Sequence, residues 1–158
     1  MAMELFEEAV LAYIAGPPQR FVRPQFSLAY QGGKGTSYPD FVVLDYKQHV
    51  AYVVEVSAAY NIAVLVGRVG ERKKRWYDAL RVHLNDLEGS FSSWGIRTTL
   101  FVRADRREAV LEALQGAEDV TVIALDDVMR SWKWNWEGQT PLNPLDHDPK
   151  GEPSKPAK

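Results

Sequence analysis

The stretch that decides the fold is SYPDFVVLDYKQHVAYVVEVSA, residues 37–58. Two apolar runs, residues 40–46 and 50–57, are joined by a three-residue connection whose length is typical of a β-hairpin. One acidic residue lies at the open end of each predicted strand: Asp40 begins the first run, and Glu55 lies near the end of the second. Because a buried carboxylate costs free energy unless something pairs with it, we expect these two side chains to have a partner.

Two interpretations of these acids follow from the sequence. Carboxylates brought side by side repel each other and raise each other's pKa unless a cation lies between them. Mg²⁺ takes oxygen ligands, one or two of them carboxylates, and such an ion activates water and stabilises the charge on a phosphate under attack. Alternatively, Asp40 follows Pro39 as ordinary turn chemistry, and Glu55 faces solvent on an edge strand. The spacing alone leaves both interpretations open.

The rest of the chain predicts an α/β protein. Apolar residues at helical spacing indicate helices, and short apolar runs rich in β-branched residues indicate strands. The later strand–helix–strand unit adds parallel strands through a right-handed crossover, so we expect a mixed sheet flanked by helices. Pro24 suggests that the first strand lies at an edge. The predicted helices cover residues 3–15, 71–87, 105–116 and 126–132, and the predicted strands cover residues 20–30, 40–46, 50–57, 95–103 and 120–125.

The composition limits the class of protein. With 158 residues, of which 46% are hydrophobic and 25% charged, the chain suits one globular domain rather than a disordered protein. No apolar run approaches the roughly 20 residues that span a bilayer. The lack of cysteine excludes disulfides and thiolate metal sites and fits a reducing compartment. We therefore expect a cytoplasmic protein without a membrane segment.

Basic residues are concentrated in two segments, residues 68–81 and 97–107, although the formal net charge is −2. Such segments suit contacts with the phosphates of a nucleic acid, and a solvated helix surface has the same composition. The candidates for nucleic-acid binding are Lys34, Arg68, Lys73 and Lys74.

The hairpin and the order of the predicted elements resemble the PD-(D/E)XK nuclease superfamily, which has the restriction-endonuclease-like fold. YPDF, residues 38–41, is similar to the PD element, and VVEVS, residues 53–57, is similar to the (D/E)XK element. The predicted order αβββαβ over residues 3–103 also matches that family's core. The resemblance implies an α/β protein with a restriction-endonuclease-like core and an extra helix–strand–helix. It also implies a Mg²⁺-dependent endonuclease that hydrolyses phosphodiester bonds in DNA.

The resemblance further implies which residues form the site. Asp40 and Glu55 would bind Mg²⁺ or Mn²⁺, with the backbone carbonyl of Val56 as a further ligand. Many members of the family also place a glutamate of the first helix in the site. Glu8 is the catalytic candidate for that role, with Glu4 and Glu7 as alternatives.

Ser57 marks the departure of this sequence from the family. The family carries a lysine two positions after the second acid, and serine cannot supply its charge. In one interpretation the cation comes from elsewhere, from Arg68, Lys73, Lys74 or Lys34, and the chain is a nuclease. In the other, catalysis has been lost, and the chain is a nuclease-fold protein that acts as a nucleic-acid-binding or assembly subunit.

The C-terminal part of the sequence predicts a docking region. Residues 1–137 are expected to form the nuclease-like domain, and residues 138–158, rich in proline and lysine, a tail. Trp132, Trp134 and Trp136 alternate, which places them on one side of an extended segment, where they would stack on bases or pack against the core or a second subunit. We therefore expect DNA as a partner, and a homodimer or a partner protein that docks through this segment and the tail.

Overall fold

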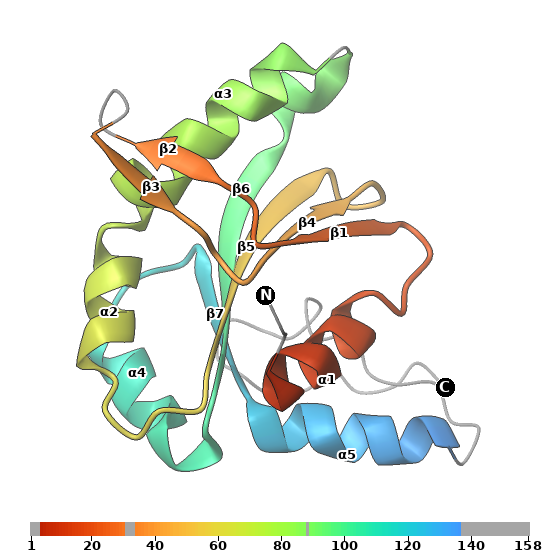
Figure 1. Cartoon of the computed structure of the whole chain (residues 1–158), viewed down its shortest axis with the longest axis vertical. Helices are drawn as coiled ribbons and strands as arrows, with labels where there is room; N and C mark the ends of the chain where they lie inside the picture. The colour runs from red at the N-terminus through yellow and green to blue at the C-terminus, as the bar shows by residue number, and fades with distance from the viewer. Residues whose placement is uncertain (1–3, 31–33, 88, 137–158) are drawn as a thin grey trace.

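Five strands form one sheet with helices on both of its faces (Figure 1). The computed structural model describes residues 4–30, 34–87 and 89–136, and the backbone alone for residues 131–136. The large sheet has the strand order β1-β4-β5-β6-β7, and β2 and β3 form a separate hairpin. The strands are β1 (Arg20–Pro24), β2 (Leu28–Tyr30), β3 (Gly35–Ser37), β4 (Phe41–Asp45), β5 (Val50–Ser57), β6 (Gly95–Val102) and β7 (Val120–Ala124). The α-helices are α1 (Leu5–Ile14), α2 (Ala63–Gly70), α3 (Asp78–Asp86), α4 (Arg107–Ala113) and α5 (Leu125–Trp136); a π-helical turn, η2 (Lys73–Tyr77), and two 3₁₀ turns, η3 (Ser90–Ser93) and η4 (Ala104–Arg106), complete the order.

The hairpin of β4 and β5 is the one that the sequence predicts. The two strands are antiparallel, with Phe41 opposite Val54 and Asp45 opposite Val50. β1 pairs with the outer side of β4 and lies at the edge of the sheet, as Pro24 indicates. β6 is parallel to β5, and β7 is parallel to β6. The predicted mixed sheet with flanking helices is therefore confirmed.

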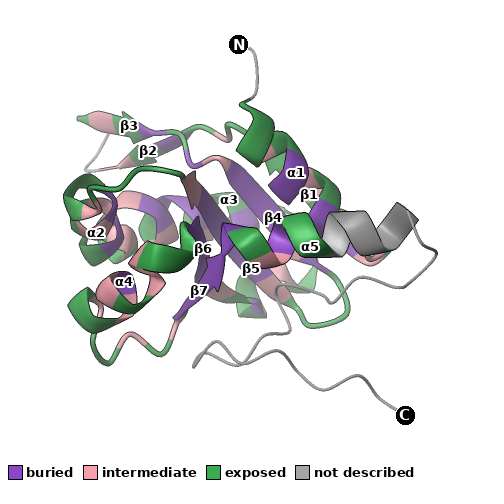
Figure 2. Cartoon of the chain, turned by 90° about the horizontal axis from the view of Figure 1, so that it is seen from below, coloured by how far each residue is buried: buried purple, intermediate pink, exposed green. Residues whose placement is uncertain are grey.

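The sheet separates two apolar cores, because successive side chains of a strand point to opposite faces. Val42 and Val53 belong to the core that α2, η2, α3 and α4 cover, whereas Val43 and Val54 belong to the core that α1 and α5 cover. Figure 2 shows the central strands as largely buried, whereas exposed residues lie on the outer sides of the helices, in the loops and on the edge strand β1 and the small hairpin. Both faces of the strands are buried, which explains their nearly continuous apolar sequences.

The predicted strand at residues 20–30 is wrong, because the chain turns in its middle. Gln25 adopts the left-handed conformation with φ +52°, and its N–H donates to the carbonyl of Asp40 at 3.0 Å. Residues 28–30 then pair with Gly35–Ser37 in the small hairpin. The segment between the predicted strands at residues 20–30 and 40–46 therefore contains β3, and the hairpin of β2 and β3 forms a sheet of its own instead of extending the main sheet.

The second helical segment begins earlier than the sequence predicts. Gly67 and Gly70 have low helix propensity, so the prediction starts the helix only at Glu71. In the structure α2 already starts at Ala63, and its apolar side chains, Leu65 and Val69 among them, are buried against the sheet. Burial of this face outweighs the low propensity of the two glycines.

The tryptophan segment is helical, and the prediction of an extended segment is wrong. α5 continues through Trp136, and residues two apart on a helix are separated by about 200° around its axis, so alternation does not place the three tryptophans on one side. Residues 137–158 lie outside the described residues, so the tail, the domain boundary and the docking role of this region stay predictions. Within the described ranges, no helix is long and apolar enough to cross a membrane.

Candidate functional site

The two acids of the hairpin meet where β4 begins. Phe41 pairs with Val54, so the same antiparallel register brings Asp40 opposite Glu55, on one face of the sheet. The Asp40 Oδ2 atom accepts a hydrogen bond of 2.7 Å from the N–H of Val56. Because β4 starts only at Phe41, this N–H lies past the end of the β4 ladder, and the carboxylate satisfies it. The hydrogen bond fixes Asp40 beside Glu55.

Both carboxylates hold their protons more tightly than usual. Glu55 is buried, with 3% of its surface exposed. Burial, and next the charge of Asp40, raise the pKa of Glu55 to about 8. Burial likewise raises the pKa of Asp40 to about 6, although the hydrogen bond from Val56 lowers it, and the carboxylate of Glu7 raises it further. At neutral pH and without a further cation, Glu55 is therefore mainly protonated.

The cation nearest to the pair comes from α2. The Arg68 Nη2 atom lies 3.4 Å from Glu55 Oε2, and 36% of the arginine side chain is exposed. Arg75, on the π-helical turn, is the second positive charge that lowers the pKa of Glu55. The Nε atoms of both arginines are buried and have no hydrogen-bond partner within the described residues. Arg68 thus contacts the pair directly, and Arg75 acts on Glu55 through its charge.

The first helix contributes Glu7 and not Glu8. Glu8 is exposed, and the structure does not bring it to the pair. Glu7 is half-buried, its Oε2 accepts the N–H of Glu4 at 3.2 Å, and its carboxylate acts on both Asp40 and Glu55. Glu4 is itself exposed, so among the three candidate glutamates the geometry favours Glu7.

Ser57 has a local structural contact. Its Oγ accepts the N–H of Ala59 at 3.4 Å, where the chain leaves β5. The serine follows Glu55 on the same face of the strand and adds no charge there. The nearby positive charge comes instead from Arg68, on the helix that follows, whose Nη2 lies 3.4 Å from Glu55 Oε2.

Of the remaining basic candidates, Lys73 and Lys74 lie farther along the same helical segment, and Lys34 lies in the small hairpin. Lys73 and Lys74 are exposed on η2 and line a pocket of about 450 Å³. Lys34 is exposed at the start of the β2–β3 hairpin's second arm. None of these three side chains forms an ion pair with a carboxylate within the described ranges, so their charges are available to a ligand.

A polar network holds the arginine-bearing segment against the sheet. Arg72 donates two hydrogen bonds to the Asp119 carboxylate, at 2.7 and 2.6 Å. The hydroxyl of Tyr77 donates to the same carboxylate at 2.6 Å and lies 2.9 Å from the Oγ1 of Thr98. These contacts join both ends of the π-helical region to β6 and the start of β7. The sequence shows the basic residues but not that Arg72 is the one with a structural role.

The carboxylate pair fits a hard divalent cation with few protein ligands. Within the residues that the structure describes, no group of three or more His, Asp or Glu side chains is arranged to hold a metal ion. Mg²⁺ is commonly bound by only one or two carboxylates, with waters and substrate oxygens as its other ligands. Asp40 and Glu55 supply that number, and burial raises the pKa of both carboxylates more than the positive charge of Arg68 lowers it. The donor set therefore suits Mg²⁺ or Mn²⁺.

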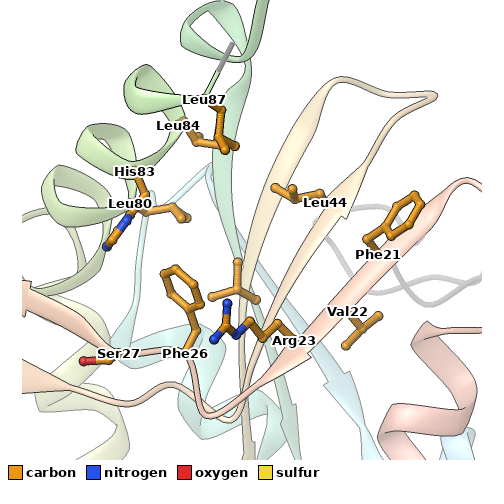
Figure 3. Close-up of a pocket in the computed structure, with 11 residues that line it drawn as sticks. Phe21, Val22, Arg23, Phe26, Ser27, Leu44, Leu80, His83, Leu84 and Leu87 are labelled. Atoms are coloured by element: carbon orange, nitrogen blue, oxygen red, sulfur yellow. The ribbon is translucent and has the colours of Figure 1, made fainter. Parts of the chain in front are cut away.

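A larger apolar pocket of about 600 Å³ lies elsewhere and is not part of this site. Figure 3 shows its lining side chains, which come from β1, β4 and α3, with Phe26 and His83 at one end and Leu87 at the other. Neither carboxylate of the pair lines it. Its walls offer few charged groups, which suits an apolar contact and not phosphate chemistry.

The fold and site together define an α/β protein whose mixed sheet carries two neighbouring carboxylates, a half-buried Asp40 and a buried Glu55, beside Arg68. No protein-family model matches the sequence, and no curated protein matches it either. One similar solved structure is the small subunit of the heterodimeric restriction endonuclease R.BspD6I, with 13% sequence identity and a TM-score of 0.43. The match covers 84% of this chain and 68% of that one. This structural likeness is distant and says nothing about activity.

Proposed function

We propose that the chain is a metal-dependent endonuclease that hydrolyses phosphodiester bonds in DNA. The observation that supports the proposal best is the Asp40–Glu55 pair, in which the buried Glu55 holds a proton at neutral pH and lies 3.4 Å from Arg68. A purely structural role does not explain a second carboxylate beside Glu55, because the repulsion between the two charges lowers stability. Such an arrangement is expected where a cation binds.

Asp40 and Glu55 would hold a Mg²⁺ or Mn²⁺ ion, with the Val56 carbonyl as a further ligand. Such an ion, when bound, polarises a phosphoryl oxygen and lowers the pKa of bound water. The N–H of Val56 keeps Asp40 in place for this role, since it fixes one carboxylate oxygen at 2.7 Å. Burial of Glu55 excludes bulk water and strengthens its attraction for a cation.

Arg68 takes the electrostatic role of the missing lysine. Its guanidinium stays charged at any working pH, so it stabilises negative charge on the phosphate but does not remove a proton from water. It lies 3.4 Å from Glu55 and is partly exposed, so it can contact the carboxylate and a substrate oxygen together. Glu7 is the further carboxylate that acts on both Asp40 and Glu55.

Cleavage of plasmid DNA with Mg²⁺ or Mn²⁺ tests the proposal. Asp40→Asn and Glu55→Gln keep the shapes of the side chains but remove the ligand charge, and each is expected to lower the rate by at least about 100-fold. Arg68→Ala is expected to cost roughly as much, and Arg68→Lys to restore part of the rate because the charge returns. Glu8→Gln is the matched control and should cleave like the wild type.

The alternative is a nuclease-fold protein that binds nucleic acid or assembles with a partner without cutting. The absence of a charge at Ser57 favours it. A wild type that binds DNA but does not cut with any divalent metal would support this alternative and contradict the nuclease proposal. Cleavage that survives in both Asp40→Asn and Glu55→Gln would instead show that another site, or a contaminant, performs it.

A further inference from the structure

A basic pocket lies at the π-helical turn that carries Arg75. It has a volume of about 450 Å³ and is lined by Tyr30, Gly70, Glu71, Arg72, Lys73, Lys74 and Arg75. We call it the π-turn pocket. π-Helical turns are rare and are found frequently at functional sites, because they displace side chains from the ordinary helical positions.

The charge of the π-turn pocket is positive after its internal pairs are counted. Arg72 is neutralised by Asp119 at 2.6 Å, and Arg75 is paired with Glu71 at 3.2 Å. Lys73 and Lys74 are exposed and form no ion pair within the described part of the chain. The pocket therefore presents two uncompensated ammonium groups, which is the chemistry that recognises phosphate.

The β2–β3 hairpin closes one side of this pocket and positions Arg75. The guanidinium of Arg75 lies 5.4 Å from the centre of the Tyr30 ring, a cation–π contact. The Tyr30 ring in turn lies so close to Gly35 that a Cβ atom there would meet it at 2.4 Å. The hairpin is fastened to the π-helical turn by a buried hydrogen bond of 2.9 Å from Trp76 Nε1 to Ser37 Oγ. The wall is thus preformed.

Arg75 links the π-turn pocket to the carboxylate pair. The same side chain lines the pocket and lowers the pKa of Glu55 through its charge. An anion in the pocket and an anion at the carboxylate site would therefore share one arginine between them. A polyanionic strand, with phosphates at regular spacing, is the ligand that meets both positions at once.

We propose that the π-turn pocket binds a backbone phosphate of the nucleic-acid strand that lies at Asp40 and Glu55, with Lys73 and Lys74 as the direct contacts. This inference rests on the proposed function for its ligand class, and it assigns the strand a path from the carboxylate pair across Arg75 to the π-helical turn. It predicts a positioning role for the lysines: they hold the strand and do not touch the reacting atoms.

The test is the binding of a fluorescent oligonucleotide, single-stranded and as a duplex, with EDTA present so that no cleavage occurs. Each lysine–phosphate contact contributes about 0.9 to the slope of log K against log salt for duplex DNA and about 0.7 for a single strand. The double variant Lys73→Ala/Lys74→Ala should therefore lower the duplex slope by about 1.8 and weaken binding on the order of 10- to 60-fold near 0.1 M salt. The single variants Lys73→Ala and Lys74→Ala are compared with Lys47→Ala, because Lys47 is an exposed lysine in the turn between β4 and β5.

The outcomes separate this inference from the proposed function. If the wild type binds and the double variant keeps its affinity within about twofold with an unchanged salt slope, the inference is wrong and the nuclease proposal is untouched. If the double variant loses affinity but the wild type does not cleave DNA with either Mg²⁺ or Mn²⁺, the inference about the pocket is supported and the nuclease proposal fails. If the wild type binds neither oligonucleotide at low salt, the pocket inference is wrong. A loss of affinity in Lys47→Ala equal to that in Lys73→Ala or Lys74→Ala would also contradict the inference, since the effect would then be one of net charge.

Discussion

Replacement of Glu55 by glutamine is expected to stabilise the metal-free protein, and the gain should grow with pH. Glutamine keeps the size and shape of the side chain and removes only its charge. In the wild type, burial and the charge of Asp40 raise the pKa of Glu55 from 4.5 to about 8. The folded protein therefore keeps a proton that the unfolded chain releases between about pH 4.5 and 8, and the wild type loses stability as the pH rises through that window.

The size of the effect follows from the same shift. A rise from 4.5 to about 8, at about 1.4 kcal/mol per pH unit, corresponds to on the order of 5 kcal/mol once the pH exceeds both values. The variant loses the contact of Glu55 with Arg68, but the arginine is partly exposed and can be solvated. We expect the free energy of unfolding of Glu55→Gln to exceed that of the wild type by about 3–5 kcal/mol near pH 9 and to be nearly equal to it near pH 4.5.

Urea denaturation with EDTA at several pH values measures this difference. Glu8→Gln removes an exposed carboxylate of α1 and serves as the control, because its effect should stay within about 0.5 kcal/mol at every pH. A Glu55→Gln variant that is less stable than the wild type near pH 9 would show that the carboxylate is a favourable structural partner of Arg68. A gain that does not change with pH would show that Glu55 is not a buried proton carrier, and either result would refute the reasoning.

Other predictions concern the polar contacts that support the site. Asp45→Ala should cost about 3–5 kcal/mol in unfolding free energy, because it leaves the fully buried Arg20 without its partner at 3.0 Å; urea denaturation measures this cost, and a loss below about 1 kcal/mol would contradict it. Asp119→Asn should cost about 1–3 kcal/mol near pH 7. Arg72 and the Tyr77 hydroxyl hold the pKa of Asp119 well below its usual value, so the wild type should keep this contribution above about pH 4 and lose it only in stronger acid. Denaturation of both proteins from about pH 2 to 7 should therefore show their difference shrink as the pH falls below about 4, and a pH-independent difference would argue against a charged Asp119.

The hairpin and its two acids were predictable because they depend on local patterns. Alternating apolar residues fix which side of each strand is buried, and a short connection fixes the antiparallel register. Asp40 and Glu55 must then lie opposite each other, as the register of Phe41 with Val54 requires. Glu7 could also have been predicted from the sequence. Val10 and Ile14 follow it by three and seven residues and therefore share its face of the helix, and both are buried.

The rest of the site depends on contacts between distant segments. Arg68 and Arg75 lie on a helical segment whose start was predicted too late, because glycine propensity does not reveal the burial of Leu65. The turn at Gln25 requires a left-handed backbone in a residue that carries no signal for it, and it redirects the chain into the small hairpin. Arg72 pairs with Asp119 because packing brings two distant segments together, and the spacing of residues in the sequence does not reveal such a pair.

The measurement that tests the central claim most directly is a calorimetric titration of the protein with Mg²⁺ or Mn²⁺ in buffers of different ionisation enthalpy. With Glu55 titrating near 8 and Asp40 near 6, binding of one ion near pH 7 should release about one proton, and near pH 9 almost none. Asp40→Asn and Glu55→Gln should each weaken the binding. Binding without proton release near pH 7, or equal affinity in both variants, would contradict a metal site at this carboxylate pair.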